Sequence, residues 1–370
     1  MKNIAIIYGG KSVEHDISVI TALQTMANLP KNYNLIPIYI KIDGEIVTAD
    51  NLNIKEIYLD YQKNVKNENI VAFLPASGCL AMIKNDKIKK KIKIDCALLC
   101  THGHGGEDGS LQGLLEMCEV PYTSSSLASS ALCMDKVLTK IVVENAKLPT
   151  PAYLHFCKCE YDENKTALLK EIDKKIGYPC IVKPASGGSS VGIGICENAQ
   201  MIECTIENAI EYDNKIIVEK FIENAREFCC AVVKIGGQLI PSKIVEVKKG
   251  KMFSFEDKYL SPKEGGKNKI DASVAKQIQK TAIETYSALE CDGVVRIDFL
   301  LGDKLYVNEV NSIPGSLSFN MFETTFADLI EVLISEGINR FEGKRKLLYS
   351  FSSSAIENYI STTKNMKFKA

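Results

Sequence analysis

The sequence predicts an α/β protein in which a doubly wound parallel sheet at the N-terminus is followed by segments that mix helices with antiparallel hairpins. Two observations predict the sheet: short apolar runs have the length and composition of buried strands, and helical patterns lie between them. Strands that alternate with helices indicate parallel pairing. The third observation is the alternation of polar and apolar residues towards the C-terminus, which is typical of hairpin strands with one buried face.

The N-terminal strands are expected at residues 3–8, 35–40 and 95–101. A helix is expected over residues 12–28, with Ser12 as its N-cap and Glu14 in its first turn. Residues 87–93 alternate Lys with Ile, which predicts a solvated strand at the edge of a sheet.

Helices and hairpins follow in the rest of the chain. A helix is expected over residues 126–147, ending before Pro149. The strand-like residues 181–183 lead into the glycine-rich turn 184–192, from which residues 191–196 return. The remaining elements are expected to be a strand at 216–221, a hairpin of 227–234 with 238–246, a helix over 271–290, and a hairpin of 294–301 with 305–310.

The 370 residues suffice for two or three domains. We expect an N-terminal α/β domain over 1–122, a central segment with a glycine-rich lid over 123–213, and a C-terminal segment over 214–347. The polar residues 348–370 form a tail to which the sequence assigns no role.

Composition excludes several classes of protein. A net charge of −1 gives no reason to expect a nucleic-acid or membrane partner. No stretch approaches the length of a membrane helix, and the first apolar run is too short for a secretory signal, so we expect a cytoplasmic protein. The 13 cysteines are odd in number and scattered, which favours reduced buried thiols over disulfides or a zinc site.

The strongest chemical signal is the C-terminal hairpin. Residues two apart in a strand share a face, so Arg296 lies with Asp298, and Glu309 lies with Asn311. Asp298 can pair with residue 307 or with residue 309, and either register places all four polar side chains on one face. Carboxylate and amide oxygens suit Mg²⁺ held together with phosphates, although the same residues would also make a surface salt-bridge ladder.

The residues that follow this hairpin favour chemistry over a salt-bridge ladder. Pro314-Gly315 forms a turn directly after Asn311, which brings backbone N–H groups beside Arg296. Such a combination is typical of a site that stabilises an oxyanion.

Three other stretches carry weaker signals. Lys183 with the glycines and serines of 187–192 can cradle phosphates, although the turn is not a Walker A loop. Glu219, followed by Glu227, suits an adenine amino group and ribose hydroxyls. An exposed glutamate on a strand, however, is more often only solvated. The loop His102–Gly109 follows a strand, where ligands of parallel sheets bind, and it can equally serve as the start of a helix.

Taken in order, these residues resemble the D-alanine–D-alanine ligase family of the ATP-grasp superfamily. The family's opening pattern corresponds to Gly9–Ser18, and its H-G-x-x-G-E-D-G-x-x-Q-G pattern corresponds to His102–Gly113. Its M-D-K motif is Met134-Asp135-Lys136, and its N-E-x-N-x-x-P-G motif is Asn308–Gly315. The resemblance runs from residue 1 to about residue 315 and implies an ATP-grasp fold.

The resemblance also implies the site residues. The phosphates of ATP would contact the lid and the lysines, namely Lys136, Lys183, Ser190 and Lys258. Adenosine would lie against Glu219, Glu227 and the backbone of Lys220 and Ile222. Two Mg²⁺ ions, which Mn²⁺ can replace, would bind to Asp298, Glu309 and Asn311. The ammonium of the first D-alanine would meet Glu14, Ser189 and Tyr259 in a pocket lined by His102, and the oxyanion would meet Arg296 and the Gly315 N–H.

The implied reaction joins two D-alanines for peptidoglycan synthesis in a protein that is commonly a homodimer. The first carboxylate attacks the γ-phosphate of ATP, and the second amino group attacks the resulting acyl phosphate. The lid at 186–192 and a loop at 251–268 would close to exclude water.

One departure leaves the second substrate open. Asn320, followed by Met321, stands where the family has a serine that holds the carboxylate of the second D-alanine. D-serine is therefore an alternative acceptor, while Tyr259 resembles members that form an amide rather than an ester. The segment 223–226 is one residue longer than usual in the family. This extra residue concerns the match of Glu227 to the family's adenosine-binding glutamate. A protein that binds nucleotide without ligation is the third alternative, but such a protein would be expected to lose Arg296 or a metal ligand.

Overall fold

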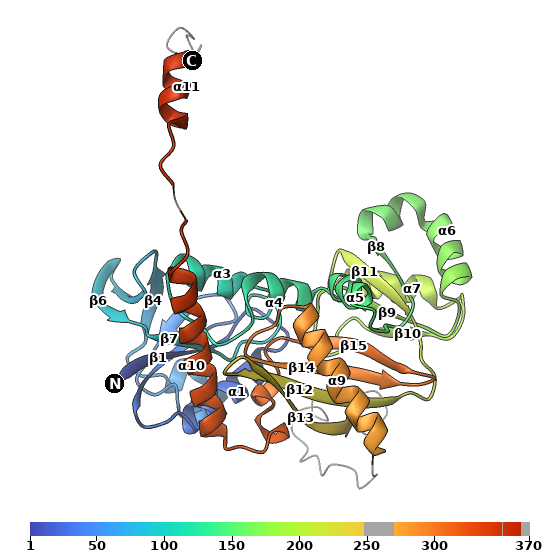
Figure 1. Ribbon diagram of the computed structural model, residues 1–370, viewed down its shortest axis with the longest axis horizontal. Helices are drawn as coiled ribbons and strands as arrows, with labels where there is room; N and C mark the ends of the chain where they lie inside the picture. The colour runs from blue at the N-terminus through green and yellow to red at the C-terminus, as the bar shows by residue number, and fades with distance from the viewer. Residues whose placement is uncertain (248–269, 350, 364–370) are drawn as a thin grey trace.

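A computed structural model describes residues 1–247, 270–349 and 351–363 and contains three sheets, each with helices packed against it (Figure 1). It confirms the expected mixed α/β fold class. In the part of the chain that the structure describes, no helix is long and apolar enough to cross a membrane.

The N-terminal sheet has seven strands in the order β6-β5-β4-β3-β2-β1-β7. Its bounds are β1 (Lys2–Gly9), β2 (Tyr33–Ile40), β3 (Ile46–Thr48), β4 (Asn69–Leu74), β5 (Cys79–Lys84), β6 (Lys87–Lys93) and β7 (Cys96–Leu99). Only β2, β1 and β7 are parallel, whereas β3 to β6 pair antiparallel with their neighbours. The doubly wound part is thus limited to three strands, because tight connections such as that from β5 to β6 can join only antiparallel strands. As predicted, β6 is the exposed edge.

Helix α1 (His15–Ala27) begins three residues later than predicted, and Ser12 is not its N-cap. The Ser12 hydroxyl instead accepts a hydrogen bond from the N–H of Glu14 at 3.1 Å, within the turn that precedes the helix. Glu14 consequently occupies the N-cap position, with its carboxylate turned to another part of the chain.

The expected helix over 126–147 is two helices, α4 (Leu127–Met134) and α5 (Lys136–Asn145). Asp135 breaks it because this residue is extended and its side chain accepts the N–H groups of Val137 and Leu138, so it caps the second helix. Lys136 is thereby the first residue of α5.

The central sheet has the order β10-β9-β11-β8. Its strands are β8 (Tyr153–Cys157), β9 (Cys180–Pro184), β10 (Gly194–Cys196) and β11 (Lys215–Lys220), and its helices are α6 (Lys158–Lys175) and α7 (Ile202–Ile210). Since β9 and β10 pair antiparallel, the glycine-rich segment between them is a hairpin connection, as predicted, although β10 begins only at Gly194.

The third sheet has the order β13-β12-β14-β15. Its elements are β12 (Arg226–Ile235), β13 (Gln238–Val247), β14 (Val294–Leu301) and β15 (Leu305–Asn311), with α9 (Ala272–Ala288) packed on it. Asp298 pairs with Glu309 and Arg296 with Asn311, so one of the two expected registers is selected by a bulge after Asp298.

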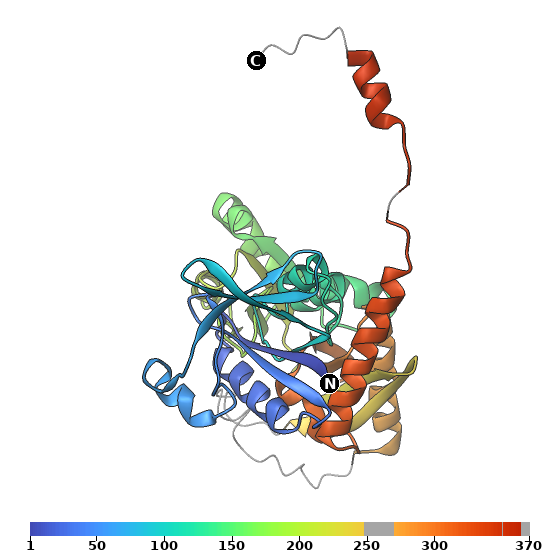
Figure 2. The ribbon, with the colours of Figure 1, turned by 90° about the vertical axis from the view of Figure 1, so that its left-hand side faces the viewer.

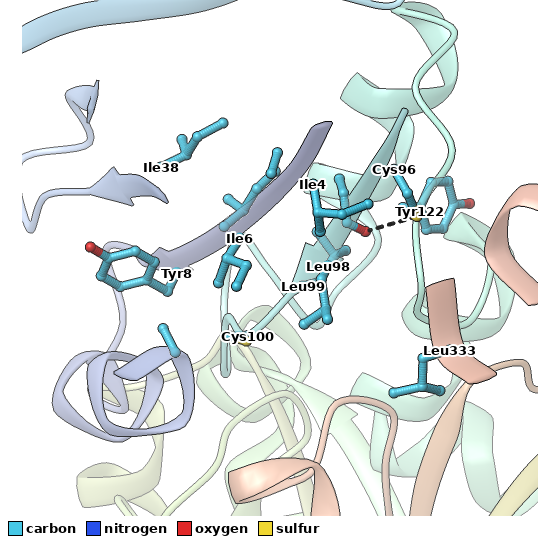
Figure 3. Packing of buried hydrophobic residues seen from close by; sticks show 14 of the residues in the cluster. Ile4, Ile6, Tyr8, Ile38, Cys96, Leu98, Leu99, Cys100, Tyr122 and Leu333 are labelled. Atoms are coloured by element: carbon cyan, nitrogen blue, oxygen red, sulfur yellow. Dashed lines mark hydrogen bonds between the residues drawn. The ribbon is translucent and has the colours of Figure 1, made fainter. Parts of the chain in front are cut away.

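The chain then returns to the N-terminal sheet. The short η2 (Gly315–Met321) packs on α1, and α10 (Phe326–Arg345) packs on β7. Figure 3 shows Leu333 of α10 near the apolar side chains of β1 and β7. The short elements η1 (Lys55–Leu59), α2 (Tyr61–Asn64) and α3 (Ser110–Met117) belong to the same half, whereas α11 (Ala355–Thr363) lies away from the body (Figure 2).

Candidate active site

The hairpin of β14 and β15 carries four polar side chains on one face. Arg296 donates through Nε and Nη2 to the two carboxylate oxygens of Asp298, at 2.7 and 2.9 Å. The amide of Asn311 donates to Asp298 Oδ2 at 3.2 Å, and Glu309 lies opposite Asp298 in the register. The predicted patch is therefore assembled, with the Asp298 carboxylate shared between an arginine and an amide.

These oxygens fit a magnesium site only with help from a ligand. Among the described residues there is no group of three His, Cys, Asp or Glu side chains that could hold a metal. Asp298 and Glu309 supply two carboxylates, and the side-chain oxygen of Asn311 is a third hard ligand. Mg²⁺ usually completes such a set with phosphate oxygens and water, so the donor set fits a metal that arrives with a nucleotide.

Lys136 joins this patch to the glycine-rich lid. Its Nζ donates to the carbonyl of Gly187 at 2.6 Å and lies 3.3 Å from Glu309 Oε1. Together with Ser190 they line a small pocket, whose other residues are Pro184, Gly188, Val191 and Ile193. The first residue of α5, the lid and the C-terminal hairpin thus meet at one point.

A buried ion triad lies beside this pocket. Lys183 of β9 donates to Oε2 of Glu219 at 2.8 Å, and the Nζ of Lys140 on α5 lies 3.3 Å from Oε1. Burial alone would raise the pKa of Glu219, but the two lysines outweigh it and lower that pKa to about 2. Burial lowers the pKa of Lys140. Two lysines on one carboxylate leave a surplus positive charge that suits an anionic ligand.

The other residues expected to hold adenosine continue from β11. Lys220 ends this strand, its N–H donates to the carbonyl of Ala152, and Ile222 follows it, half-buried. Glu227 is half-buried on β12 and pairs with Leu300, which places it on the sheet face that also carries Asp298.

The lid also contacts the N-terminal domain. The hydroxyl of Ser189 donates to Glu14 Oε1 at 2.6 Å, and Glu14 is only 7% exposed. The backbone is so close that a Cβ atom on Gly188 would lie 2.4 Å from Glu14 Oε2. The glycine-rich turn and the residue that precedes α1 are therefore in direct contact.

His102 holds the turn that contains Gly315. Its Nδ1 donates to the carbonyl of Ile313 at 2.8 Å, and burial lowers its pKa to about 4, so the ring is neutral. Its Nε2 must then accept from the hydroxyl of Thr21 at 2.9 Å, while the Thr21 oxygen accepts from the N–H of Ser316 at 3.0 Å. The structure thus ties His102 to the backbone on both sides of Gly315.

Glu107 makes a second connection to the same turn. Its Oε1 accepts from the N–H of Ile313 at 2.8 Å and its Oε2 from the N–H of Gly103 at 3.1 Å. Burial, together with the nearby Glu14 carboxylate, raises the pKa of Glu107 to about 8, although these N–H donors favour the ionised form.

The turn leads into η2. Ser316, Leu317 and Ser318 all adopt positive φ angles near 50°. Met321 is buried in the core of the N-terminal half, whereas Asn320 is exposed. Lys258, Tyr259 and the predicted loop 251–268 lie outside the described residues.

Three residues with buried polar contacts in this region were given no role by the sequence. Glu107 lies in a recognised motif, and Lys140 follows Lys136 by one helical turn. The sequence therefore contains a signal for each of these two residues. Thr21 gave no signal, because its contact with Ser316 depends entirely on tertiary packing.

A larger cleft lies away from these residues, between α3 and α10. Its charged groups already join the two helices and the sheet: Arg340 donates to the carbonyls of Tyr122 and Ser124, and Lys344 pairs with Glu116 at 2.7 Å. Its charges therefore support the fold rather than chemistry.

Two family models match the chain. The model described as "D-ala D-ala ligase N-terminus" matches residues 3–125, and the one described as "D-ala D-ala ligase C-terminus" matches residues 142–334. The D-alanine–D-alanine ligase of Thermosipho melanesiensis is 39% identical over 362 residues, covering 93% of this chain and 96% of the relative. That of Thermosipho africanus is also 39% identical, covering 96% and 99%.

Solved structures are similar over the same length. The VanG D-Ala:D-Ser ligase from Enterococcus faecalis has a TM-score of 0.77 and 31% identity, covering 91% of this chain and 99% of the other. The D-alanine–D-alanine ligase from Coxiella burnetii has a TM-score of 0.78 and 25% identity, covering 98% and 99%.

Proposed function

This chain belongs to the D-alanine–D-alanine ligase family, and we propose how its residues carry out the reaction of that family. It is an ATP-dependent D-alanine ligase whose product serves cell-wall synthesis. The observation that best supports the residue roles is the position of Lys136, which contacts the lid and the carboxylate of Glu309 at once.

The phosphates of ATP would lie between the lid and the C-terminal hairpin. Lys136, Lys183 and Ser190 would contact them, together with Lys258. Asp298, Glu309 and Asn311 would hold two Mg²⁺ ions, or Mn²⁺, which neutralise phosphate charge when bound. Adenosine would lie against Glu219, Glu227 and the backbone of Lys220 and Ile222, which continue from the end of β11.

The first D-alanine would bind with its ammonium at the Glu14 carboxylate, which Ser189 orients from the lid and Tyr259 supports. Its carboxylate attacks the γ-phosphate of ATP, and ADP leaves. The lid at 186–192 excludes water from the acyl phosphate that forms.

The second amino group then attacks the acyl carbon, and phosphate leaves. Arg296 and the N–H of Gly315 stabilise the oxyanion of the tetrahedral intermediate. We place His102 in the support of this step, because its ring holds the turn before Gly315.

We propose D-alanine as the acceptor. D-serine is the second candidate, because Asn320 replaces the expected serine and because a similar structure is a D-Ala:D-Ser ligase. We further propose that the protein is cytoplasmic and works as a homodimer. Light scattering after size-exclusion chromatography tests the dimer.

The deciding experiment measures ADP release with ATP, Mg²⁺ and D-alanine, with D-serine or D-lactate added in parallel, and identifies the products by mass. D-alanyl-D-alanine as the main product supports the proposal. D-alanyl-D-serine would keep the mechanism and change the acceptor, and no D-alanine-dependent ADP release would refute ligation.

A further inference from the structure

The turn 312–316, which carries Gly315, is fastened to the N-terminal domain on both sides. On one side the Ile313 N–H donates to Glu107, and on the other the Ser316 N–H donates to Thr21. The hydroxyl of Ser312 also donates to the backbone carbonyl of Glu107 at 3.3 Å. In the part of the chain that the structure describes, the N–H of Gly315 between them donates to no protein group.

We propose that Glu107 is a positioning residue for ligation: its carboxylate fixes the backbone of Ile313, so that the Gly315 N–H points at the oxyanion of the tetrahedral intermediate. This inference rests on the proposed function of Gly315. Glu107 acts through the backbone, because its two carboxylate oxygens already accept the N–H groups of Gly103 and Ile313.

The ionised form of Glu107, which prevails above its raised pKa of about 8, is suited to this position because both of its oxygens accept hydrogen bonds. Glu107 takes one backbone N–H on each oxygen, from Gly103 in its own loop and from Ile313 in the turn. A glutamine has the same shape but only one acceptor oxygen, so its NH₂ group must face one of the two N–H donors in either orientation. Glu107→Gln therefore breaks one of the two bonds without a change in volume.

The alignment matters because an oxyanion donor works only over a narrow range of positions. Misplacement by about 1 Å can cost about a hundredfold in rate. The main effect is expected in the step in which the oxyanion develops, and the KM for D-alanine is measured to detect an indirect effect through the nearby Glu14. Formation of the acyl phosphate depends on Lys136, Lys183 and the metal patch, none of which contacts Glu107.

The chain offers a matched control in the next residue. Asp108 also accepts two backbone N–H groups, from Gly105 at 2.7 Å and from Ser110 at 2.9 Å. These bonds stay within its own loop. Asp108→Asn therefore removes the same kind of contact while leaving the turn at Gly315 fastened.

The test is run above pH 8, where Glu107 is ionised, and compares the wild type, Glu107→Gln, Asp108→Asn and Thr21→Val. Thr21→Val loosens the other side of the turn. Three quantities are measured: kcat for ligation, the rate of positional isotope exchange in ATP with D-alanine, which reports acyl-phosphate formation, and the affinity for a phosphinate analogue of the tetrahedral intermediate. We expect Glu107→Gln and Thr21→Val to lower kcat and phosphinate affinity about tenfold to a hundredfold, with isotope exchange and the KM for ATP within about threefold of wild type.

Several results would overturn the inference. One is an unchanged kcat in Glu107→Gln, and another is an equal loss of isotope exchange and ligation. A loss in Asp108→Asn as large as that in Glu107→Gln would show general loosening of the loop. Amide hydrogen exchange of peptides covering 312–316 tests the fastening without any activity, and unchanged exchange in Glu107→Ala, which removes both acceptor oxygens, would refute it. A wild type that is inactive with D-alanine would refute the proposed function instead.

Discussion

Gly188→Ala tests the contact between the lid and Glu14. The new Cβ would lie 2.4 Å from Oε2 and 2.7 Å from Oε1 of Glu14, whereas ordinary contacts begin near 3.4 Å. The lid or the carboxylate must therefore move by about 1 Å, which can cost about a hundredfold, or about 2.7 kcal/mol, where positioning matters. Because the obstacle is the end of a side chain, we expect the melting temperature to change little.

The assay is steady-state ADP release as a function of D-alanine concentration at saturating ATP. Gly187→Ala is the matched control, since its Cβ would meet only Pro184 Cβ at an ordinary 3.8 Å. We expect kcat/KM for D-alanine to fall about a hundredfold in Gly188→Ala and less than about threefold in Gly187→Ala. Similar values for both variants would refute the proposed role of Glu14 at the lid.

Four further outcomes are expected. Arg296→Ala should lower ligation by about 10²–10³-fold while ATP binding, measured by calorimetry, survives; loss of nucleotide binding as the main defect would contradict the oxyanion role. Lys140→Met should raise the Kd for ATP about tenfold, because Lys183 alone then pairs with the Glu219 carboxylate. An unchanged Kd would show that Lys140 stabilises only the fold. The pKa of His102 is lowered to about 4 in the folded protein. The free energy of unfolding should therefore fall by up to about 3 kcal/mol as the pH decreases from 6.5 towards 4. Urea unfolding of His102→Gln should show a weaker pH dependence. Asn320→Ser should change the ratio of D-serine to D-alanine incorporation more than the KM for ATP, and an unaltered product ratio would place Asn320 outside the acceptor pocket.

Local patterns predicted most of the elements, and long-range packing accounts for the exceptions. Period-two alternation located β14 and β15 within one residue, because one face of that hairpin is buried. The helix over 126–147 was predicted as continuous because Asp135 carries no obvious break signal. Its capping role is visible only once the chain turns towards β9, where the N–H of Lys136 donates to Ala185.

The residues of the candidate site also fall into two groups, those placed by local strand geometry and those placed by long-range packing. The shared face of Arg296, Asp298, Glu309 and Asn311 follows from strand geometry and was predicted. The fastening of Ile313 by Glu107 joins residues 206 positions apart, and no local pattern encodes such a distance. The sequence resemblance covered the motif that contains Glu107, but only the fold assigns it a partner.

The return of α10 to the first sheet has a consequence for synthesis of the protein. β1 and β7 are complete early, yet Leu329, Ile330 and Leu333, which pack in their core, leave the ribosome roughly 200 residues later. At elongation rates of about 5–20 residues per second this delay lasts roughly ten to forty seconds. During that interval the nascent N-terminal sheet presents an uncovered apolar surface, so chaperone binding should concentrate there until the last core helix emerges.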